Sequence, residues 1–250
     1  MIVQSLRLNW PQWQGGMDPN YQIGQEILAA IVPPSQTTPT MTVPVSSQAT
    51  PLAGIDGGKQ LYDQKKYVQQ LLDAQQPQHL LILGGDCSVS ATPFDYLHGK
   101  YPNDFGVIWL DAHPDISTPQ DFHHLHEMVV ADLLGQSHSI FSEALRYPLV
   151  PDQIFLAGLQ VQELRPMDHL ASDLKLAYAT PDALTIAESV LKWLKSKGIH
   201  HVVIHFDLDA LDPDDFRSIL PAQPHLDRTS FGACLGPWCP QEFESFHRGH

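Results

Sequence analysis

The sequence of 250 residues lacks an apolar run long enough to cross a bilayer. A transmembrane helix needs about 20 consecutive apolar residues, and every apolar run in this chain is shorter. The first residues also lack a basic segment followed by a continuous apolar one, so we expect no signal peptide. These absences argue against a protein that spans a membrane and against one that is secreted.

Cysteine is scarce as well, with three residues at positions 87, 234 and 239. So few cysteines do not make the disulfide framework that holds small secreted folds together. This usage is typical of a reducing compartment, and we expect a cytoplasmic protein.

Basic side chains are also few, since 14 Lys and Arg residues stand against 28 Asp and Glu residues, giving a formal net charge of −14. This excess argues against nucleic acid and anionic membranes as partners, because like charges repel. An acidic site could attract a cationic substrate. The simpler explanation for most of the charge is that it keeps the protein soluble.

What the chain does contain is enough apolar sequence for one large core, with 43% hydrophobic residues. Apolar runs typical of strands alternate with segments of helical periodicity. The main expected strands are residues 80–83, 106–110, 153–157 and 201–207, and the main expected helices are residues 21–31, 61–72, 89–98 and 128–134. Because strands and helices alternate, we predict an α/β domain over residues 1–250 with a mostly parallel sheet.

Three side chains that commonly bind metals follow the strand expected at residues 106–110. Asp111, His113 and Asp115 stand at steps of two, and an extended chain sends such residues to one side. Two carboxylates and one imidazole form half of a divalent-metal site. The competing explanation is a polar loop whose aspartates only cap the next helix.

A matching pair follows the strand expected at residues 201–207. Asp207 and Asp209 are two residues apart and should also face one way. Asp212 stands before Pro213, so a turn is its simpler role.

A third motif, Gly84-Gly-Asp-Cys-Ser88, follows the strand expected at residues 80–83. Paired glycines let the backbone turn tightly and approach a ligand. Asp86 or Ser88 could instead simply cap the next helix.

Ligands of a parallel sheet gather at the carboxyl ends of its strands, so four carboxylates and one histidine should meet there. Their mutual repulsion would be costly when buried, and two divalent cations would remove it. Hard oxygen ligands with one imidazole favour Mn²⁺ over structural zinc. Two such ions can share a water molecule and lower its pKa.

These motifs resemble those of the arginase, agmatinase and formimidoylglutamase family of manganese ureohydrolases. The resemblance rests on residues 84–88, 111–115 and 206–213, covers roughly residues 78–216, and is strongest with the arginase branch. It implies a three-layer α/β/α fold with a central, mostly parallel sheet. It also implies that one or two Mn²⁺ ions activate a water molecule that cleaves a C–N bond of a guanidino or amidino compound.

The resemblance also implies a set of site residues. The implied metal ligands are Cys87, Asp111, His113, Asp115, Asp207 and Asp209, and the implied catalytic residues are His126, Asp111 and Asp209. Asp111 and Asp207 would bridge two ions, and His126 would shuttle a proton to the leaving amine. A surface position is the competing explanation for His126.

The chain departs from the family pattern at several positions. The family has His where this chain has Cys87, and a thiolate is softer than Mn²⁺ prefers, so Cys87 could instead be a buried, inert residue. Ser117 replaces an Asn that contacts substrate in arginases, and Glu127 replaces a Gly. Residues from about 217 to 250 look atypical or truncated.

Three hypotheses follow. The first is a Mn²⁺-dependent hydrolase. The second is a catalytically impaired, ureohydrolase-like metal-binding protein with a regulatory or unknown role. A flavodoxin-like binding module is the third, but it would leave the clustered carboxylates unexplained. As partners we expect a guanidino or amidino small molecule, no nucleic acid and no membrane, and we expect a homo-oligomer.

Overall fold

The computed structural model describes residues 4–181, 183–212 and 216–218. Helices and strands alternate along this part of the chain, and each pairing between its strands is parallel. The prediction of an α/β fold with parallel strands is therefore confirmed. No helix within the described ranges is both long and apolar enough to cross a membrane.

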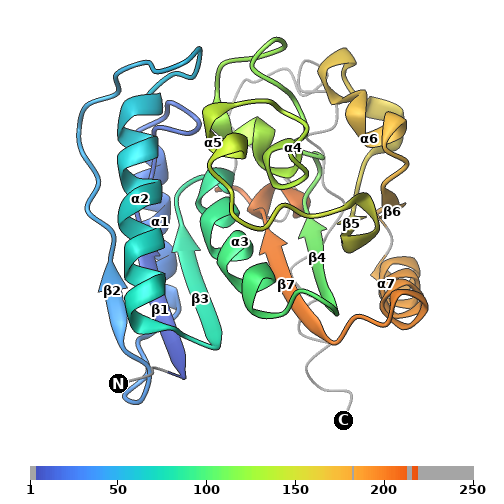
Figure 1. Cartoon of the computed structure of the whole chain (residues 1–250), viewed down its shortest axis with the longest axis horizontal. Coiled ribbons are helices and arrows are strands. Elements are labelled where there is room, and N and C mark those ends of the chain that lie inside the picture. Colours follow the sequence, from blue (N-terminus) through green and yellow to red (C-terminus); the bar gives the residue numbers. More distant parts are fainter. Residues whose placement is uncertain (1–3, 182, 213–215, 219–250) are drawn as a thin grey trace. The chain divides into compact units, whose positions relative to one another are not determined.

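The chain divides into two compact units, each with its own parallel sheet (Figure 1). The first unit comprises residues 1–100 and 115–149, and the second comprises residues 101–114 and 150–250. The single domain expected over residues 1–250 stays a prediction. Of the atypical stretch expected at about 217–250, residues 219–250 lie outside the described residues.

The sheet of the first unit has the strand order β2–β1–β3. Its strands are β1 (Ser5–Trp10), β2 (Thr40–Thr42) and β3 (His79–Gly84), and its helices are α1 (Asn20–Ile31), α2 (Gly58–Gln75), α3 (Ala91–Lys100), α4 (Val129–Leu133) and α5 (Ile140–Glu143). The expected helices at residues 21–31 and 61–72 correspond to α1 and α2.

Alternation along β1 puts a helix on each face of this sheet. Leu6 and Leu8 are buried in one hydrophobic cluster with Leu72 of α2. Arg7 points the other way and donates hydrogen bonds to the carbonyl oxygens of Val32, at 2.5 Å, and Ala29, at 3.2 Å, at the end of α1. Successive side chains of β1 therefore point to opposite faces of the sheet, and a helix covers each face.

The sheet of the second unit has the strand order β6–β5–β4–β7. Its strands are β4 (Phe105–Leu110), β5 (Ile154–Ala157), β6 (Ala177–Ala179) and β7 (His201–Phe206), and its helices are α6 (Leu170–Asp173) and α7 (Ala183–Lys197). A Cβ atom on Gly106 would lie 2.7 Å from the Trp193 ring and 2.8 Å from Ile199 Cδ1. Glycine therefore lets α7 and the residues after it pack closely on β4.

Candidate metal centre

Strands β4 and β7 deliver two acidic motifs of the second unit to one edge of its sheet. The strands pair in parallel, with Trp109 opposite His205 and Leu110 opposite Phe206. The next residues, Asp111 and Asp207, leave the sheet together, and the Asp207 N–H donates to the Leu110 carbonyl at 2.9 Å. The carboxyl ends of parallel strands thus meet as the sequence predicted.

Asp111, His113 and Asp209 come together in the second unit, with potential ligand atoms all within 4.8 Å of one another. His113 Nδ1 lies 3.0 Å from Asp209 Oδ2 and 3.4 Å from Asp111 Oδ1. The loops that hold them are stiffened locally, since the His113 N–H donates to Asp111 Oδ1 at 2.6 Å. The Asp209 N–H likewise donates to Asp207 Oδ1 at 2.9 Å.

These residues fit a divalent metal ion. Two ligands held at about 2.1 Å from one ion and at a right angle to each other lie about 3.0 Å apart, close to the separations around His113. Asp209 Oδ1 is buried, and no described residue donates a hydrogen bond to it. An ion pair between His113 and Asp209 is the competing explanation, but it involves Oδ2 and leaves Oδ1 without a donor. A cation would compensate that buried oxygen.

The electrostatics of this cluster follow from burial and crowding. Burial and then the charge of Asp209 raise the pKa of Asp111 well above its ordinary value. Burial also acts to raise the pKa of Asp209, but the charge and hydrogen bond of His113 outweigh it, so this pKa is lowered. Burial lowers the pKa of His205 to about 3, so its imidazole is neutral. A neutral imidazole is the form that binds metals.

The first unit holds two further predicted ligands, Cys87 and Asp115. Both are buried, and the Cys87 Sγ and an Asp115 carboxylate oxygen lie within 4.8 Å of each other. Asp115 has a φ of 44°, in the left-handed region that Asp adopts more readily than most residues. Its carbonyl accepts the Val130 N–H at 2.9 Å, which holds this conformation in place.

The Gly84–Ser88 motif has a structural role in the first unit. A Cβ on Gly85 would lie 1.8 Å from the Gln12 carbonyl oxygen, so this glycine permits a close approach of two backbones. Asp86 caps the short helix that follows it, because its carboxylate accepts the Ser88 N–H at 3.0 Å. The same carboxylate accepts the Gly15 N–H at 3.0 Å. The alternative of a capping aspartate is therefore confirmed.

His126 is held in the first unit with one ring nitrogen already engaged. Its Nδ1 lies 2.9 Å from the Gly15 carbonyl oxygen, and its Nε2 lies 3.7 Å from Glu127 Oε1. A carbonyl can only accept, so the hydrogen bond places a proton on Nδ1 and leaves Nε2 to exchange one. Ser117 is fully buried, and its hydroxyl donates to the Glu127 carbonyl at 2.8 Å. Ser117, which replaces the substrate-contacting Asn of arginases, therefore has a structural role here.

Sequence reasoning missed one buried histidine next to the cluster, His205. It precedes Asp207 by two residues on β7, so the step of two that selected Asp207 and Asp209 applies to it as well. Its Nε2 lies 3.7 Å from Asp111 Oδ2.

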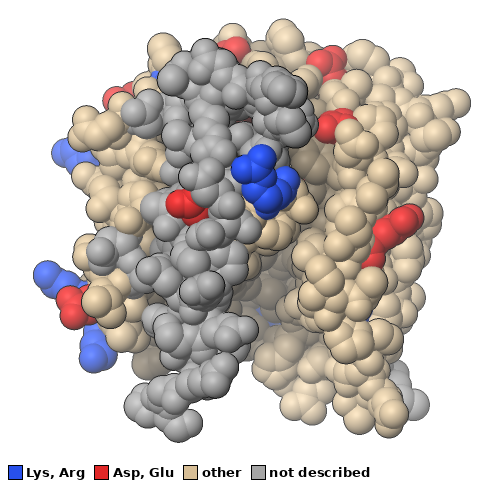
Figure 2. Space-filling view, turned by 180° about the vertical axis from the view of Figure 1, so that it is seen from behind, with Lys and Arg blue, Asp and Glu red and all other residues tan. Residues whose placement is uncertain are grey.

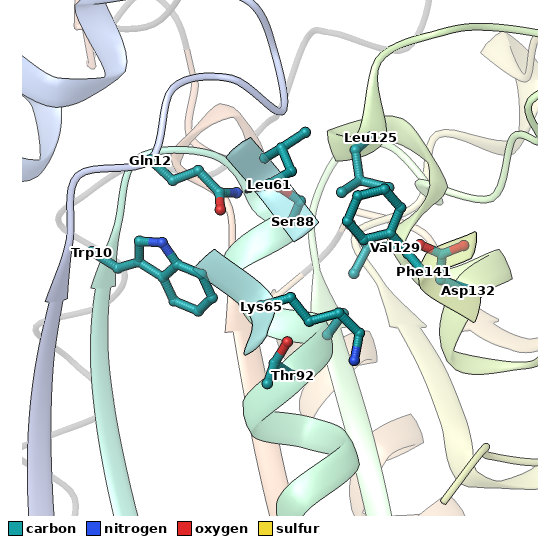
Figure 3. Close-up of a pocket in the computed structure, with 11 residues that line it drawn as sticks. Trp10, Gln12, Leu61, Lys65, Ser88, Thr92, Leu125, Val129, Asp132 and Phe141 are labelled. Atoms are coloured by element: carbon teal, nitrogen blue, oxygen red, sulfur yellow. Dashed lines mark hydrogen bonds between the residues drawn. The ribbon is translucent and has the colours of Figure 1, made fainter. Parts of the chain in front are cut away.

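The first unit also buries a polar cluster that contains none of the predicted ligands. Asp132 Oδ1 accepts hydrogen bonds from the hydroxyls of Ser137 and of Ser139, the latter at 2.7 Å. Lys65 Nζ donates to the Ala144 carbonyl at 3.0 Å. Figure 3 shows Lys65 and Asp132 among the residues around a small cavity of about 20 Å³, enough for one water molecule.

Comparison with known proteins decides the family. A family model described as the arginase family matches residues 40–219, well over half of the chain. The chain belongs to the arginase family. That span contains every predicted ligand, from Cys87 to Asp209.

Curated relatives of this arginase-family chain match about half of it. An arginase from Staphylococcus aureus is 27% identical over 140 residues, which is 53% of this chain and 46% of the relative. Human arginase-1 is 30% identical over 145 residues, 53% of this chain and 45% of that protein. The chain thus spans about half the length of these relatives.

Solved structures match more of the chain at lower identity, and they show the fold. An arginase from Entamoeba histolytica in complex with L-ornithine is 18% identical, with a TM-score of 0.66 over 86% of this chain and 78% of that one. A formimidoylglutamase from Bacillus subtilis is 14% identical, with a TM-score of 0.66 over 98% of this chain and 74% of that one. The α/β fold implied by the sequence resemblance is therefore confirmed.

Proposed function

We propose that this protein is a Mn²⁺-dependent hydrolase that cleaves a C–N bond of a guanidino or amidino compound. The observation that carries the proposal is the convergence of Asp111, His113 and Asp209 in an arginase-family chain, with Asp209 Oδ1 buried and without a donor among the described residues. When bound, a divalent metal lowers the pKa of its water and so supplies a nucleophile near neutral pH.

Some of the proposed metal ligands are supported by distances in the structure, and others by the family resemblance alone. Asp111, His113 and Asp209 have the separations expected of ligands around one ion, and Asp207 is close enough for its charge to act on Asp111. Asp115 and Cys87 are proposed as ligands of a second ion on the strength of the family resemblance. Hard carboxylate ligands favour Mn²⁺ over softer metals.

His126 is proposed as the proton carrier for the leaving amine. With Nδ1 bonded to the Gly15 carbonyl, Nε2 can accept a proton and release it again. His126→Asn should therefore lower kcat by about 10²- to 10⁴-fold while leaving the amount of bound Mn²⁺ unchanged. His123→Asn is the matched control, because His123 Nδ1 also lies near a backbone carbonyl, that of Gly54, at 3.1 Å.

The substrate is proposed to be a cationic small molecule. The net charge of −14 favours such a partner electrostatically. Figure 2 shows charged side chains of both signs scattered over the described part of one face, with no continuous basic patch there. We further propose a cytoplasmic location, from the cysteine usage, and a homo-oligomeric assembly.

The test is a purification with Mn²⁺, followed by elemental analysis and a screen for urea or ammonia release from guanidino and amidino compounds. We expect bound Mn²⁺ and product from at least one compound. Protein that binds Mn²⁺ but releases no product would identify a catalytically impaired homologue. Protein that binds no Mn²⁺ would overturn the proposal.

A further inference from the structure

His205 is held rigidly beside the acidic cluster of the second unit. It is 8% exposed, and its ring stacks on the indole of Trp109, its partner across the two parallel strands, with centroids 3.6 Å apart and planes 11° apart. Trp109 is fully buried and donates its indole N–H to Asp111 Oδ2 at 3.2 Å. One tryptophan therefore orients both the His205 ring and one oxygen of Asp111.

The two carboxylate oxygens of Asp111 face different imidazoles. Oδ1 lies 3.4 Å from His113 Nδ1, and Oδ2 lies 3.7 Å from His205 Nε2. Two ligands of one ion, each bound at about 2.1 Å, lie about 3.0 Å apart when adjacent and about 4.2 Å apart when opposite. The 3.7 Å separation falls within this range and is too long for a hydrogen bond.

A carboxylate with a ring nitrogen near each oxygen is suited to hold an ion at each oxygen. Oδ2 of Asp111 also accepts the Trp109 N–H, but a carboxylate oxygen has two lone pairs and can bind an ion as well. Packing alone would not call for a ring nitrogen at position 205, because phenylalanine would stack on Trp109 equally well.

We propose that His205 is a nitrogen ligand of a metal ion that also binds Asp111 Oδ2. This inference rests on the metal-dependent function proposed above, and it adds a ligand that neither the sequence motifs nor the family resemblance assigns. Together with His113 at Oδ1, His205 gives each oxygen of Asp111 its own imidazole.

The test compares Mn²⁺ binding by the wild-type chain and by His205→Phe, which keeps an aromatic ring against Trp109 and removes the nitrogen. His201→Phe is the matched control. His201 lies four residues earlier on β7, stacks on Tyr101 with centroids 3.9 Å apart, and has its Nδ1 2.8 Å from Asp104 Oδ1. Equilibrium dialysis with elemental analysis counts the ions. Pulsed EPR of bound Mn²⁺ counts directly coordinated imidazole nitrogens.

We expect the wild type and His201→Phe to bind two Mn²⁺ ions, the second more weakly, with two imidazole nitrogens coordinated. His205→Phe should bind the second ion at least about tenfold more weakly and lose one nitrogen signal. The inference is overturned if His205→Phe binds Mn²⁺ as the wild type does, whether one ion or two. A wild type that binds no Mn²⁺, or whose binding Asp209→Asn does not weaken, overturns the proposed function and this inference together.

Circular dichroism of metal-free His205→Phe checks that the variant folds. If it does not fold, pulsed EPR of wild-type protein with ¹⁵N-labelled histidine decides the question. Two directly coordinated histidine nitrogens at saturating Mn²⁺ support His205 as a ligand, and a single one refutes it.

Discussion

The carboxylates of Asp132 in the first unit and Asp111 in the second are both almost fully buried, but their surroundings differ. Around Asp132, two serine hydroxyls donate to one carboxylate oxygen, and Ser139 Oγ in turn accepts the N–H groups of Phe141, at 3.1 Å, and Ser142, at 3.0 Å. Donors and acceptors alternate there, and the cluster caps α5.

Around Asp111, carboxylates and imidazoles crowd together. Asp209 and Asp207 both act electrostatically to raise the pKa of Asp111, and Asp209 Oδ1 has no donor among the described residues. Burial raises the pKa of Asp132 as well, to about 6. A raised pKa therefore does not distinguish the two clusters. They differ in the neighbouring carboxylates around Asp111 and in Asp209 Oδ1, which has no donor among the described residues. A cation would relieve the repulsion among the carboxylates around Asp111, and no such repulsion from the described residues acts on Asp132.

Neutralising one acid in each cluster should affect metal binding in one case and leave it unchanged in the other. Asp209→Asn should abolish Mn²⁺-dependent hydrolysis, a loss of at least about 10³-fold, because it removes a charged ligand. Asp132→Asn should leave hydrolysis and Mn²⁺ binding unchanged, since the Asn oxygen can still accept both serine hydroxyls.

Thermal unfolding with and without Mn²⁺ compares metal binding by Asp132→Asn and Asp209→Asn without an activity assay. Mn²⁺ at about 100 times its dissociation constant should stabilise the wild type by about 2.7 kcal/mol. Asp132→Asn should keep this stabilisation and Asp209→Asn should lose it. If Asp209→Asn retains both the stabilisation and the turnover, the metal site and the chemistry lie elsewhere.

The pH dependence of stability should reveal the cost of burying Asp132. Its pKa is about 6 in the folded protein, against an ordinary value of 3.8, so the unfolded chain releases this proton first as the pH rises. The stability of metal-free protein should then fall between about pH 4 and pH 6, by up to about 3 kcal/mol from this group. Asp132→Asn cannot lose a proton and should remove that part of the slope.

Urea unfolding from pH 4 to pH 7 measures this difference between the wild type and Asp132→Asn. Asp63→Asn is the control, because Asp63 is exposed and lies in a surface ion pair with Lys59. Identical slopes in the wild type and Asp132→Asn would show that the serine hydroxyls compensate the buried charge fully.

Much of the fold could be predicted because local patterns carry it. The apolar runs ending at Leu83, Leu110 and Phe206 correspond to β3, β4 and β7, since strand periodicity and flanking residues suffice to mark them. The helix predicted at residues 21–31 is present as α1, but the apolar side chains of Ile23 and Ile27 on it are 56% and 53% exposed in the structure. Periodicity defines a helix face and does not say what covers it.

The candidate site was predictable where the proposed ligands alternate just after a strand, as for Asp111 with His113. It was harder where the partner is non-local. His205 has no charge and precedes the acidic motif, so only its register with Trp109 reveals that it lies near Asp111. The role of Ser117, a hydroxyl bonded to the Glu127 carbonyl, depends on a contact ten residues away that no local pattern specifies.

The smallest expected effect concerns Cys87, which brings a thiol close to the buried carboxylate of Asp115 within the first unit. A thiol binds metal as its thiolate, and that soft ligand suits Mn²⁺ less well than an imidazole does. We therefore expect Cys87→His to tighten the weaker Mn²⁺ ion by about tenfold, moving the stoichiometry at low Mn²⁺ toward two per chain.

Cys87→Ser is the matched control, because it keeps the small side chain and offers no nitrogen. If Cys87 is an inert core residue, Mn²⁺ titration of Cys87→Ser should coincide with that of the wild type. If the thiolate binds the metal as tightly as an imidazole would, Cys87→Ser should weaken the second ion, and the unmutated protein should bind two ions tightly. That result would contradict the prediction and make Cys87 a competent ligand. The two variants together therefore show whether position 87 has lost its metal ligand or has exchanged an imidazole for a thiolate.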